Sequence, residues 1–287
     1  MENENKCIGE NYSKEIIRKM KGKIIVIKYG GSVIKNEKCK KAFLENVAYL
    51  RKVGINIVIV HGGGPSISKY LKENSIKTQF INGLRVTDKK TMEVVEMVLS
   101  GNINKELASH LCELHVNALG ISGRDCNLIR TKKKYVYVNN EKIDIGYVGE
   151  VEKINTKFLK DIIKLGYIPV IAPIGTDEFK GTYNINADYA ASAVSSALKA
   201  EKLVLMTDVE GVYLDINNKS SLLKQITVSD IKKYIKNGII KGGMIPKMEC
   251  CIQAIEQGTN SINLIDGRKE NSLLLDVFEE GNCTAIV

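Results

Sequence analysis

Short apolar runs that alternate with helical patterns constrain the fold of this 287-residue chain more than any other feature. The runs are rich in Val and Ile and bounded by glycine, which is typical of parallel strands buried on both faces of a sheet. They cover residues 24–29, 56–60, 168–172, 202–206 and 261–265. Helical patterns cover residues 37–53, 88–115, 155–165, 187–200, 229–236 and 244–257. This alternation predicts an α/β fold, a three-layer αβα sandwich around a mostly parallel central sheet.

The pattern changes between Cys126 and Val151, where short alternating segments replace the long apolar runs. The segments LIRT, YVYV and IDIGYVGEV predict an antiparallel β-hairpin insertion. Three consecutive lysines, Lys132, Lys133 and Lys134, stand between the first two segments. We predict that these lysines form a solvated hairpin turn.

Composition and charge argue against several classes of protein. The first residues are polar and charged, and no apolar run approaches the roughly 20 residues that a membrane-spanning helix needs. The net charge is +9, but the lysines are spread along the chain, so neither nucleic acid nor a membrane is an expected partner. The seven cysteines lack CxxC spacing, which predicts reduced thiols and no metal site. We expect a cytoplasmic protein.

Two glycine-rich segments follow the first two predicted strands. KYGGS covers residues 28–32, and HGGGP covers residues 61–65 ahead of a helical pattern. Glycine lets backbone N–H groups approach an anion closely, and a helix N-terminus adds the positive end of its dipole. Because ligands bind beyond the carboxyl ends of parallel strands, the two loops predict a cradle for phosphoryl oxygens. The chain has no P-loop motif, and no GxGxxG opens a helix after the first strand.

Four charged side chains occupy positions where they could serve such a cradle. Lys28 ends the first strand, Lys247 lies just inside a helix, Asp188 lies in a first helical turn, and Arg85 precedes a helix. An aspartate at a helix start also stabilises the helix dipole, and a lone lysine or arginine is usually a solvated surface residue. In company, however, an aspartate can hold two lysines by ion pairing, and arginine binds carboxylates through two parallel hydrogen bonds.

Taken together, KYGGS, VIVHGGGP, NGLRVTD, YNINADYAA, TDVEGVY and GGMIPK resemble the motifs of the amino-acid kinase family. The resemblance runs from about residue 22 to the C-terminus. The NGLRVTD segment is similar to that of members that bind N-acetyl-L-glutamate rather than carbamate, aspartate or UMP. The resemblance therefore implies ATP-dependent phosphorylation of the side-chain carboxylate of N-acetyl-L-glutamate, with Mg²⁺, as a step of arginine biosynthesis.

The family pattern also implies roles for individual residues. Lys28 and Lys247 would stabilise the transferring phosphoryl group, and Asp188 would organise both lysines. The substrate would be held by Gly63, Gly64, Arg85 and Asn184. The nucleotide would be held by Gly30, Gly31, Thr207, Asp208, Tyr213, Gly243 and Met244. A carboxylate with a pKa of roughly 4.3 is already ionised at pH 7 and needs no general base, so we expect His61 to pack the loop rather than catalyse.

The resemblance extends to organisation and assembly. It implies an N-terminal helical extension over residues 1–21, an amino-acid substrate-binding and dimerisation lobe over residues 22–178, and an ATP-binding lobe over residues 179–287. The tail after residue 272 is similar to that of the arginine-inhibited branch, which implies L-arginine as an effector and a homo-oligomer, either a dimer or a hexamer. We expect Asp276, Glu279 and Glu280 to supply the acids of an arginine site.

Three alternatives remain open at the level of sequence. One is a kinase for a related acyl-amino acid, such as a carrier-bound aminoadipate. Another is a non-catalytic amino-acid sensor, although Lys28, Lys247 and Asp188 are all present. The third is a nucleic-acid binder, which would show binding that weakens steeply with salt.

Overall fold

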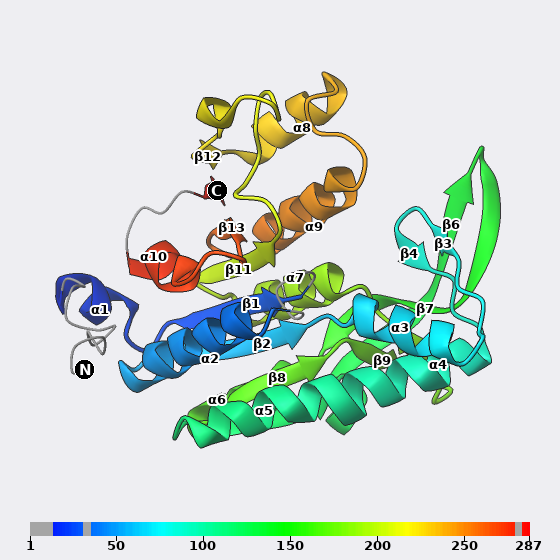
Figure 1. Cartoon of the computed structure of the whole chain (residues 1–287), viewed down its shortest axis with the longest axis horizontal. Coiled ribbons are helices and arrows are strands. Elements are labelled where there is room, and N and C mark those ends of the chain that lie inside the picture. The colour runs from blue at the N-terminus through cyan, green and yellow to red at the C-terminus, as the bar shows by residue number, and fades with distance from the viewer. Residues whose placement is uncertain (1–13, 31–35, 279–282) are drawn as a thin grey trace.

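A central sheet of eight strands organises the molecule in the computed structural model, which describes residues 14–30, 36–278 and 283–287. Its strands, in chain order, are β1 (Ile24–Tyr29), β2 (Asn56–His61), β5 (Ala118–Ser122), β8 (Ile168–Ala172), β11 (Lys202–Thr207), β12 (Gln225–Ile226), β13 (Ile262–Asp266) and β14 (Thr284–Ile286). Their order across the sheet is β12-β14-β13-β11-β1-β2-β8-β5. Neighbouring strands are parallel except for the antiparallel pair β13 and β14. The predicted mostly parallel sheet is therefore confirmed (Figure 1).

Helices cover both faces of this sheet. One face packs on α2 (Glu37–Lys52), α3 (Gly64–Glu73), α4 (Lys89–Glu96), α5 (Asn104–Glu113) and α10 (Ser272–Phe278). The other packs on α6 (Thr156–Lys164), α7 (Ala187–Leu198), α8 (Val228–Lys236) and α9 (Met244–Glu256). Side chains alternate across β1, so Ile25 and Ile27 enter the first core while Val26 enters the second. Both cores explain why each central strand reads as a continuous apolar run.

The predicted β-hairpin insertion is present over residues 129–154, where two long strands replace the short segments expected over residues 126–151. It consists of β6 (Ile129–Val138) and β7 (Glu141–Ile154), which pair antiparallel and close into a small barrel with β9 (Ile174–Thr176) and β10 (Thr182–Asn184). A second hairpin, β3 (Phe80–Ile81) with β4 (Leu84–Arg85), stands beside it (Figure 1). The sequence patterns did not predict this short hairpin.

The prediction of a turn at residues 132–134 is wrong. All three lysines lie inside β6, and the chain turns instead at Asn139 and Asn140. Both asparagines have positive φ, at 50° and 67°, which is the backbone that a two-residue hairpin turn requires.

Charge pairing across the hairpin explains why the lysines are accommodated in a strand. Nζ of Lys132 lies 3.4 Å from a carboxylate oxygen of Glu150, and Nζ of Lys133 lies 2.6 Å from one of Asp144. Both acids belong to β7. Opposite charges on paired strands stabilise a sheet modestly, which offsets the low strand propensity of lysine.

The single helix expected over residues 88–115 is broken by a π-helical segment. α4 continues into η2 (Met97–Ile103), a π-helix, and then into α5. Asp88 caps the N-terminus of α4 by accepting from the backbone N–H of Thr91 at 2.7 Å. A π-helical turn widens the helix, so side chains beyond it point in directions that a regular 3.6-residue period does not predict.

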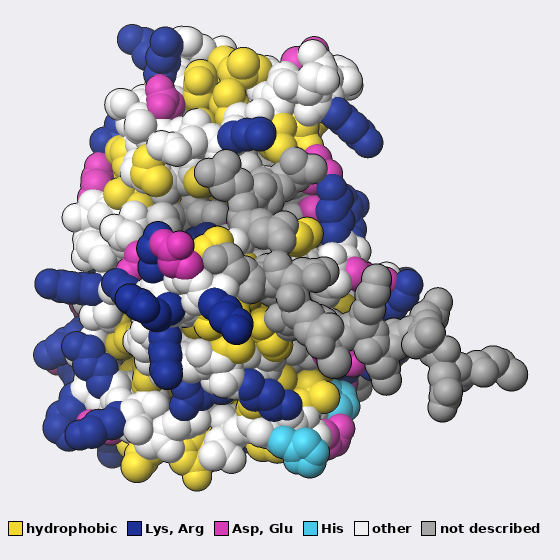
Figure 2. Space-filling view, turned by 90° about the vertical axis from the view of Figure 1, so that its left-hand side faces the viewer, with side chains coloured by type: hydrophobic (Ala, Val, Ile, Leu, Met, Phe, Trp, Pro, Cys, Tyr) yellow, Lys and Arg dark blue, Asp and Glu magenta, His cyan; other side chains and the backbone are white. Residues whose placement is uncertain are grey.

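The N-terminal helix is described as α1 (Lys14–Met20), within the predicted extension. Its residues Ile16, Ile17 and Met20 are partly buried against the first core. Figure 2 shows the face that carries this end of the molecule, where lysine and arginine side chains are abundant and interspersed with apolar and acidic ones.

No helix among the described residues is long and apolar enough to span a membrane. The six described cysteines are free thiols.

Candidate active site

The candidate active site lies at the carboxyl ends of the central strands. β1 is hydrogen-bonded to β2 on one side and to β11 on the other, so Lys28 occupies the middle of the sheet. Asp188 lies in the first turn of α7, where Asn186 caps the helix by accepting from the N–H of Asp188 at 2.8 Å. Lys247 lies in the first turn of α9. Three elements that are distant in sequence thus meet at one edge of the sheet.

Asp188 bridges the two lysines. Its Oδ1 lies 3.1 Å from Nζ of Lys28, and its Oδ2 accepts a hydrogen bond from Nζ of Lys247 at 2.7 Å. The side chains are 12 to 17% exposed, so water screens the pairs little. One carboxylate therefore holds two ammonium groups that would otherwise repel each other. The role of Asp188 in organising both lysines for catalysis stays a prediction.

The protonation states follow from this geometry. Burial acts to raise the pKa of Asp188, but the charges of Lys28 and Lys247 outweigh it and lower that pKa to about 2. Burial acts to lower the pKa of Lys247, yet Asp188 outweighs it and raises the pKa above the usual lysine value. The carboxylate and the ammonium of Lys247 are therefore both charged at neutral pH, and neither is suited to proton transfer.

The two glycine loops approach each other beside Lys28. The N–H of Gly62 donates to the carbonyl of Tyr29 at 2.7 Å, which ties the loop after β2 to the end of β1. A Cβ added to Gly30 would lie 3.1 Å from Nζ of Lys28, so a side chain there would crowd the ammonium. Gly31, also assigned to the nucleotide, lies outside the described residues.

Gly63 packs closely against η2. A Cβ at this position would lie 2.4 Å from Cδ2 of Leu99 and 2.7 Å from Cδ1 of Ile103. Gly64 begins α3, and no atom lies within 4 Å of the point that a Cβ would occupy there, so its space is open. The π-helical segment η2 therefore packs against the loop after β2 and helps to position the backbone N–H groups of that loop.

A cavity of about 260 Å³ unites the residues assigned to the amino-acid substrate. Its lining includes Gly63, Gly64, Arg85 and Asn184, and also both Lys28 and Asp188. The structure thus brings together all four predicted substrate residues with two of the three predicted catalytic residues.

Arg85 is buried in the wall of this cavity. Its guanidinium donates to the hydroxyls of Thr78 and Ser68 at 2.6 and 2.7 Å and to the carbonyl of Gly64 at 3.1 Å, and it lies 4.6 Å from the ring centroid of Phe80. Within the described part of the chain, no carboxylate forms an ion pair with it. A buried guanidinium held by neutral acceptors retains its charge for an anionic ligand.

His61 packs the loop, as expected. The side chain is 0% exposed, and burial lowers its pKa to about 4. Nδ1 lies 3.0 Å from the carbonyl of Gly62, while Nε2 lies 3.1 Å from the amide nitrogen of Asn104 in α5. These contacts fit a neutral ring that donates through Nδ1 and accepts through Nε2. Packed side chains enclose the imidazole, so the ring does not line the cavity of about 260 Å³.

A larger cavity of about 620 Å³ lies on the other side of the Asp188 cluster. Its wall includes Asp188, Lys247 and Gly243, which is the residue that precedes α9. Met244, the first residue of α9, is partly buried against the second core and does not line this cavity. Lys134 of β6 also lines it, although the sequence patterns gave that residue no role.

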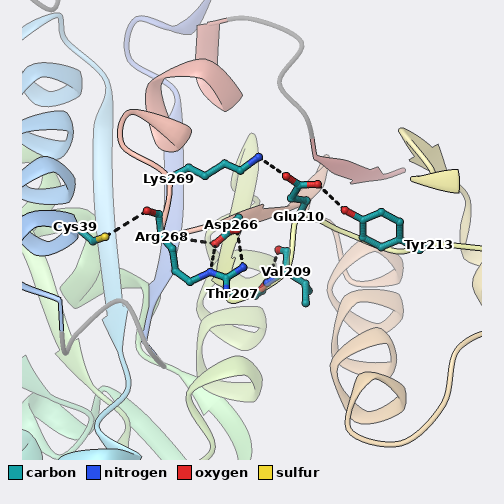
Figure 3. Close-up of polar contacts among 8 residues, drawn as sticks. All are labelled: Cys39, Thr207, Val209, Glu210, Tyr213, Asp266, Arg268 and Lys269. Atoms are coloured by element: carbon teal, nitrogen blue, oxygen red, sulfur yellow. Dashed lines mark hydrogen bonds and ion pairs between the residues drawn. The ribbon is translucent and has the colours of Figure 1, made fainter. Parts of the chain in front are cut away.

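The other residues assigned to the nucleotide, Thr207, Asp208 and Tyr213, line neither cavity. They lie at and beyond the end of β11, where Figure 3 shows the hydrogen bonds around Thr207 and Tyr213. The Thr207 hydroxyl donates to the carbonyl of Val209 at 2.7 Å, and the Tyr213 hydroxyl donates to Glu210 at 2.5 Å. The carboxyl end of β11 neighbours that of β1, so these residues occupy the same edge of the sheet as Lys28.

Sequence reasoning missed an ion-paired group at this edge. Asp266, the last residue of β13, accepts two hydrogen bonds from the guanidinium of Arg268, at 2.9 and 2.8 Å. Lys269 pairs with Glu210, and the thiol of Cys39 in α2 donates to the carbonyl of Arg268 at 3.3 Å (Figure 3). Asp266 and Arg268 could have been found from the rule that functional residues follow parallel strands, because INLID ends at the same edge as the other loops.

Known proteins with similar sequences are members of one kinase family. The sequence profile of the amino acid kinase family matches residues 23–265, and the chain belongs to that family. Within the family it is similar to the acetylglutamate kinase of Clostridium acetobutylicum, with 57% identity over 257 residues that cover 90% of this chain and 87% of the relative. It is also 50% identical to the acetylglutamate kinase of Caldicellulosiruptor bescii, over 92% and 90% of the two chains. The resemblance seen in the motifs is confirmed.

Solved structures agree on the fold. An N-acetylglutamate synthase from Neisseria gonorrhoeae, complexed with coenzyme A and N-acetyl-glutamate, aligns with a TM-score of 0.82 at 22% identity over 95% of this chain and 61% of that one. Carbamate kinase from Giardia lamblia bound to AMP-PNP aligns with a TM-score of 0.66 at 14% identity over 93% and 99%. At these identities the likeness concerns the fold alone.

Proposed function

We propose that this chain transfers the terminal phosphoryl group of ATP to the side-chain carboxylate of N-acetyl-L-glutamate and releases an acyl phosphate. The observation that carries the proposal is the Lys28–Asp188–Lys247 cluster between a small cavity and a larger one. The acetylglutamate kinases that share about half of its residues support the choice of substrate. We expect the reaction in the cytoplasm, where ATP is available.

The chemistry requires positioning and positive charge rather than proton transfer. A carboxylate oxygen of the substrate attacks the terminal phosphorus of ATP, the bond from that phosphorus to the bridging oxygen breaks, and ADP leaves with the electron pair. Lys28 and Lys247 stabilise the charge that spreads over the phosphoryl oxygens, and Asp188 fixes both ammonium groups beforehand. No proton moves, which agrees with a buried and neutral His61.

Substrate recognition is assigned to the smaller cavity. Arg85 binds the α-carboxylate of N-acetyl-L-glutamate, and Asn184 binds a neighbouring polar group. The amide of Asn184 is itself held 3.4 Å from the hydroxyl of Thr87. The N–H groups of Gly63 and Gly64 face the carboxylate that accepts the phosphoryl group. A cavity of about 260 Å³ lined by a buried cation suits a small dianion of this kind.

The nucleotide is assigned to the edge formed by Gly30, Gly31, the end of β11 and the start of α9. In the described ranges no cluster of three or more His, Cys, Asp or Glu side chains could hold a metal ion by itself. Mg²⁺ commonly binds through substrate phosphates and water with few protein ligands, so these residues fit an ion that arrives with ATP. When bound, Mg²⁺ neutralises charge on the phosphate chain.

The assignment of residues 22–178 to the amino acid and 179–287 to ATP remains part of this proposal.

L-Arginine as an effector, and assembly into a dimer or hexamer, also remain proposals. The structure corrects one part of the expected arginine site. Asp276 is 4% exposed and already accepts from Asn263 at 2.5 Å, with Nζ of Lys202 at 3.4 Å, so it has no free carboxylate to offer. Glu279 and Glu280 lie outside the described residues.

The decisive experiment couples ADP release to pyruvate kinase and lactate dehydrogenase and traps the acyl phosphate with hydroxylamine. N-Acetyl-L-glutamate should give equal amounts of ADP and hydroxamate. A carrier-bound aminoadipate and free glutamate serve as competing acceptors. Turnover with aminoadipate but not with N-acetyl-L-glutamate would move the proposal to the alternative substrate. Absence of ATP-dependent hydroxamate with every acceptor would favour a non-catalytic sensor.

A further inference from the structure

Lys134 differs from the two lysines that precede it. Lys132 and Lys133 are paired with acids of β7, at 3.4 and 2.6 Å. Lys134 is half-buried, and among the residues that the structure describes no carboxylate lies within ion-pair distance of it. Its Nζ lies instead 4.6 Å from the ring centroid of Tyr189. The ammonium of Lys134 therefore has an aromatic contact rather than a counter-ion, so an anionic ligand can pair with it.

An irregularity of the hairpin lies opposite this side chain. Lys133 pairs with Gly149 of β7, but the next paired residue, Tyr135, lies opposite Asp144, so the additional residues of the bulge belong to β7. Bulges commonly occur next to active sites. Lys134 and Val136, two residues apart in β6, line the same cavity, as expected for one face of a strand. The ammonium of Lys134 lies over Tyr189 of α7, the residue that directly follows Asp188.

The cavity that Lys134 faces is the one that reaches the catalytic cluster. Lys134, Asp188, Lys247 and Gly243 all line the cavity of about 620 Å³. The single charge of Asp188 is shared by Lys28 and Lys247, and Glu249, the other acid in the wall, is exposed to solvent. The inner part of this cavity therefore has an excess of positive charge, which suits a polyanion.

We propose that Lys134 binds an oxygen of the polyphosphate chain of the nucleotide and is a third cation of the phosphoryl-transfer site. The aromatic face of Tyr189 holds the ammonium in place before the nucleotide arrives. This inference rests on the proposed function, because it requires that the polyphosphate chain of a nucleotide bound at the end of β11 and the start of α9 reach the larger cavity beside Gly243 and Lys247. It adds to that function a residue that belongs to the β6–β7 hairpin rather than to the glycine loops.

The test is calorimetric binding of AMP-PNP with Mg²⁺, together with turnover, for the full-length protein and three variants. Lys134→Met removes the cation and keeps the length of the side chain. Lys134→Arg keeps the cation. Lys132→Met is the matched control, since it removes a cation of the same strand that is 57% exposed and paired with Glu150. Circular dichroism melting of each variant checks that the hairpin is intact.

Lys134→Met should weaken AMP-PNP binding about 10-fold, as expected for the loss of a charge-assisted hydrogen bond. Lys134→Arg should stay within about 3-fold of wild type, and Lys132→Met should match it. The salt dependence of binding should also be shallower for Lys134→Met, because one ionic contact is lost. Equal affinities for Lys134→Met and Lys132→Met in an active protein would overturn this inference and leave the proposed function intact. Failure of the wild type both to bind AMP-PNP and to turn over would instead overturn the proposed function.

Discussion

At the scale of single residues, the site depends on one carboxylate that serves two cations. Asp188 contacts Lys28 and Lys247 through different oxygen atoms, at 3.1 and 2.7 Å. Without this carboxylate the two ammonium groups would repel each other, and each would lose its orientation. The carboxylate therefore holds both ammonium groups in position before any substrate binds. Such preorganised charges stabilise a transition state efficiently.

Replacing either lysine should abolish most of the activity. Lys28→Ala or Lys247→Ala should lower kcat by ~10²-fold or more, with a smaller change in the KM of either substrate, because preorganised charges act mainly in the transition state. Steady-state kinetics with both substrates measures this. Lys157→Ala is the control, since that lysine is 88% exposed and pairs with Asp161 one helical turn away. A lysine variant that keeps more than about a third of the wild-type kcat would remove that lysine from the mechanism.

His61 should make stability depend on pH. The unfolded chain takes up a proton at this histidine near pH 6.5, whereas the folded protein does so only near pH 4, because burial disfavours the cation. The free energy of unfolding should therefore fall as the pH drops from about 6.5 to about 4, by about 3 kcal/mol from this group alone. Urea unfolding at a series of pH values should show a shallower fall for His61→Asn than for wild type.

His115→Asn is the control for that experiment. His115 is exposed and has a φ of 60°, a conformation that asparagine tolerates well. Its pH profile should follow that of wild type. An unchanged slope in His61→Asn would contradict the assignment of His61 as a buried neutral ring.

At the scale of elements, the π-helical segment and the glycine loop form one packed unit. Leu99 and Ile103 belong to η2 and occupy the space that a side chain at residue 63 would need. The cradle for the substrate is thus positioned by a helix irregularity as well as by the carboxyl end of β2. A regular helix over the same residues would point these two side chains elsewhere.

Gly63→Ala should therefore destabilise the protein by about 1–3 kcal/mol, because the added methyl overpacks the contact with Leu99 and Ile103. Gly64→Ala is the matched control for stability, since no atom lies within 4 Å of its Cβ position. Urea or thermal unfolding of both variants measures the difference. Equal stability of the two variants would show that η2 yields to the methyl group and does not fix the loop.

Sequence patterns predict an element well when a single physical effect, such as burial on both faces, determines its structure. The prediction for β1 and β8 is accurate to the residue, because strands buried on both faces leave continuous apolar runs. The pattern over residues 88–115 predicts a regular helix, because periodicity carries no signal for a π-helical turn. The lysines of β6 mislead because their local charge density suggests a turn, whereas the pairing acids are 11 to 18 residues further along.

At the scale of the whole molecule, the meeting of distant residues could not be derived from spacing. Each motif around Lys28, Asp188 and Lys247 could be recognised alone, but only the sheet order places β1 next to β11 and brings α7 and α9 to its edge. Strand order depends on how the helices pack, which local patterns do not encode. For the same reason sequence reasoning missed Lys134, and it treated Asp276 as available although that residue is buried.

Removing residues 1–21 should separate catalysis from assembly. The described part of this segment, α1, contributes only partly buried side chains to the first core, so turnover should remain largely intact. If the segment joins subunits, the truncated protein should form dimers where the full chain forms larger oligomers, and inhibition by L-arginine should be weaker. Light scattering and activity against arginine concentration measure both effects. Full activity of the intact chain at millimolar arginine would contradict an arginine-linked role for this segment.

The central position of β1 has a consequence for how the chain is made. Ile25 pairs with Lys202, so β1 is translated early but acquires its second neighbour only after some 175 further residues have been added. At ~5–20 residues per second, one edge of this apolar strand stays open on the ribosome for about 10–35 s. An unpaired hydrophobic edge is a template for pairing with other nascent chains. The protein should therefore depend on a chaperone that binds nascent chains when translation is slow or the temperature is high.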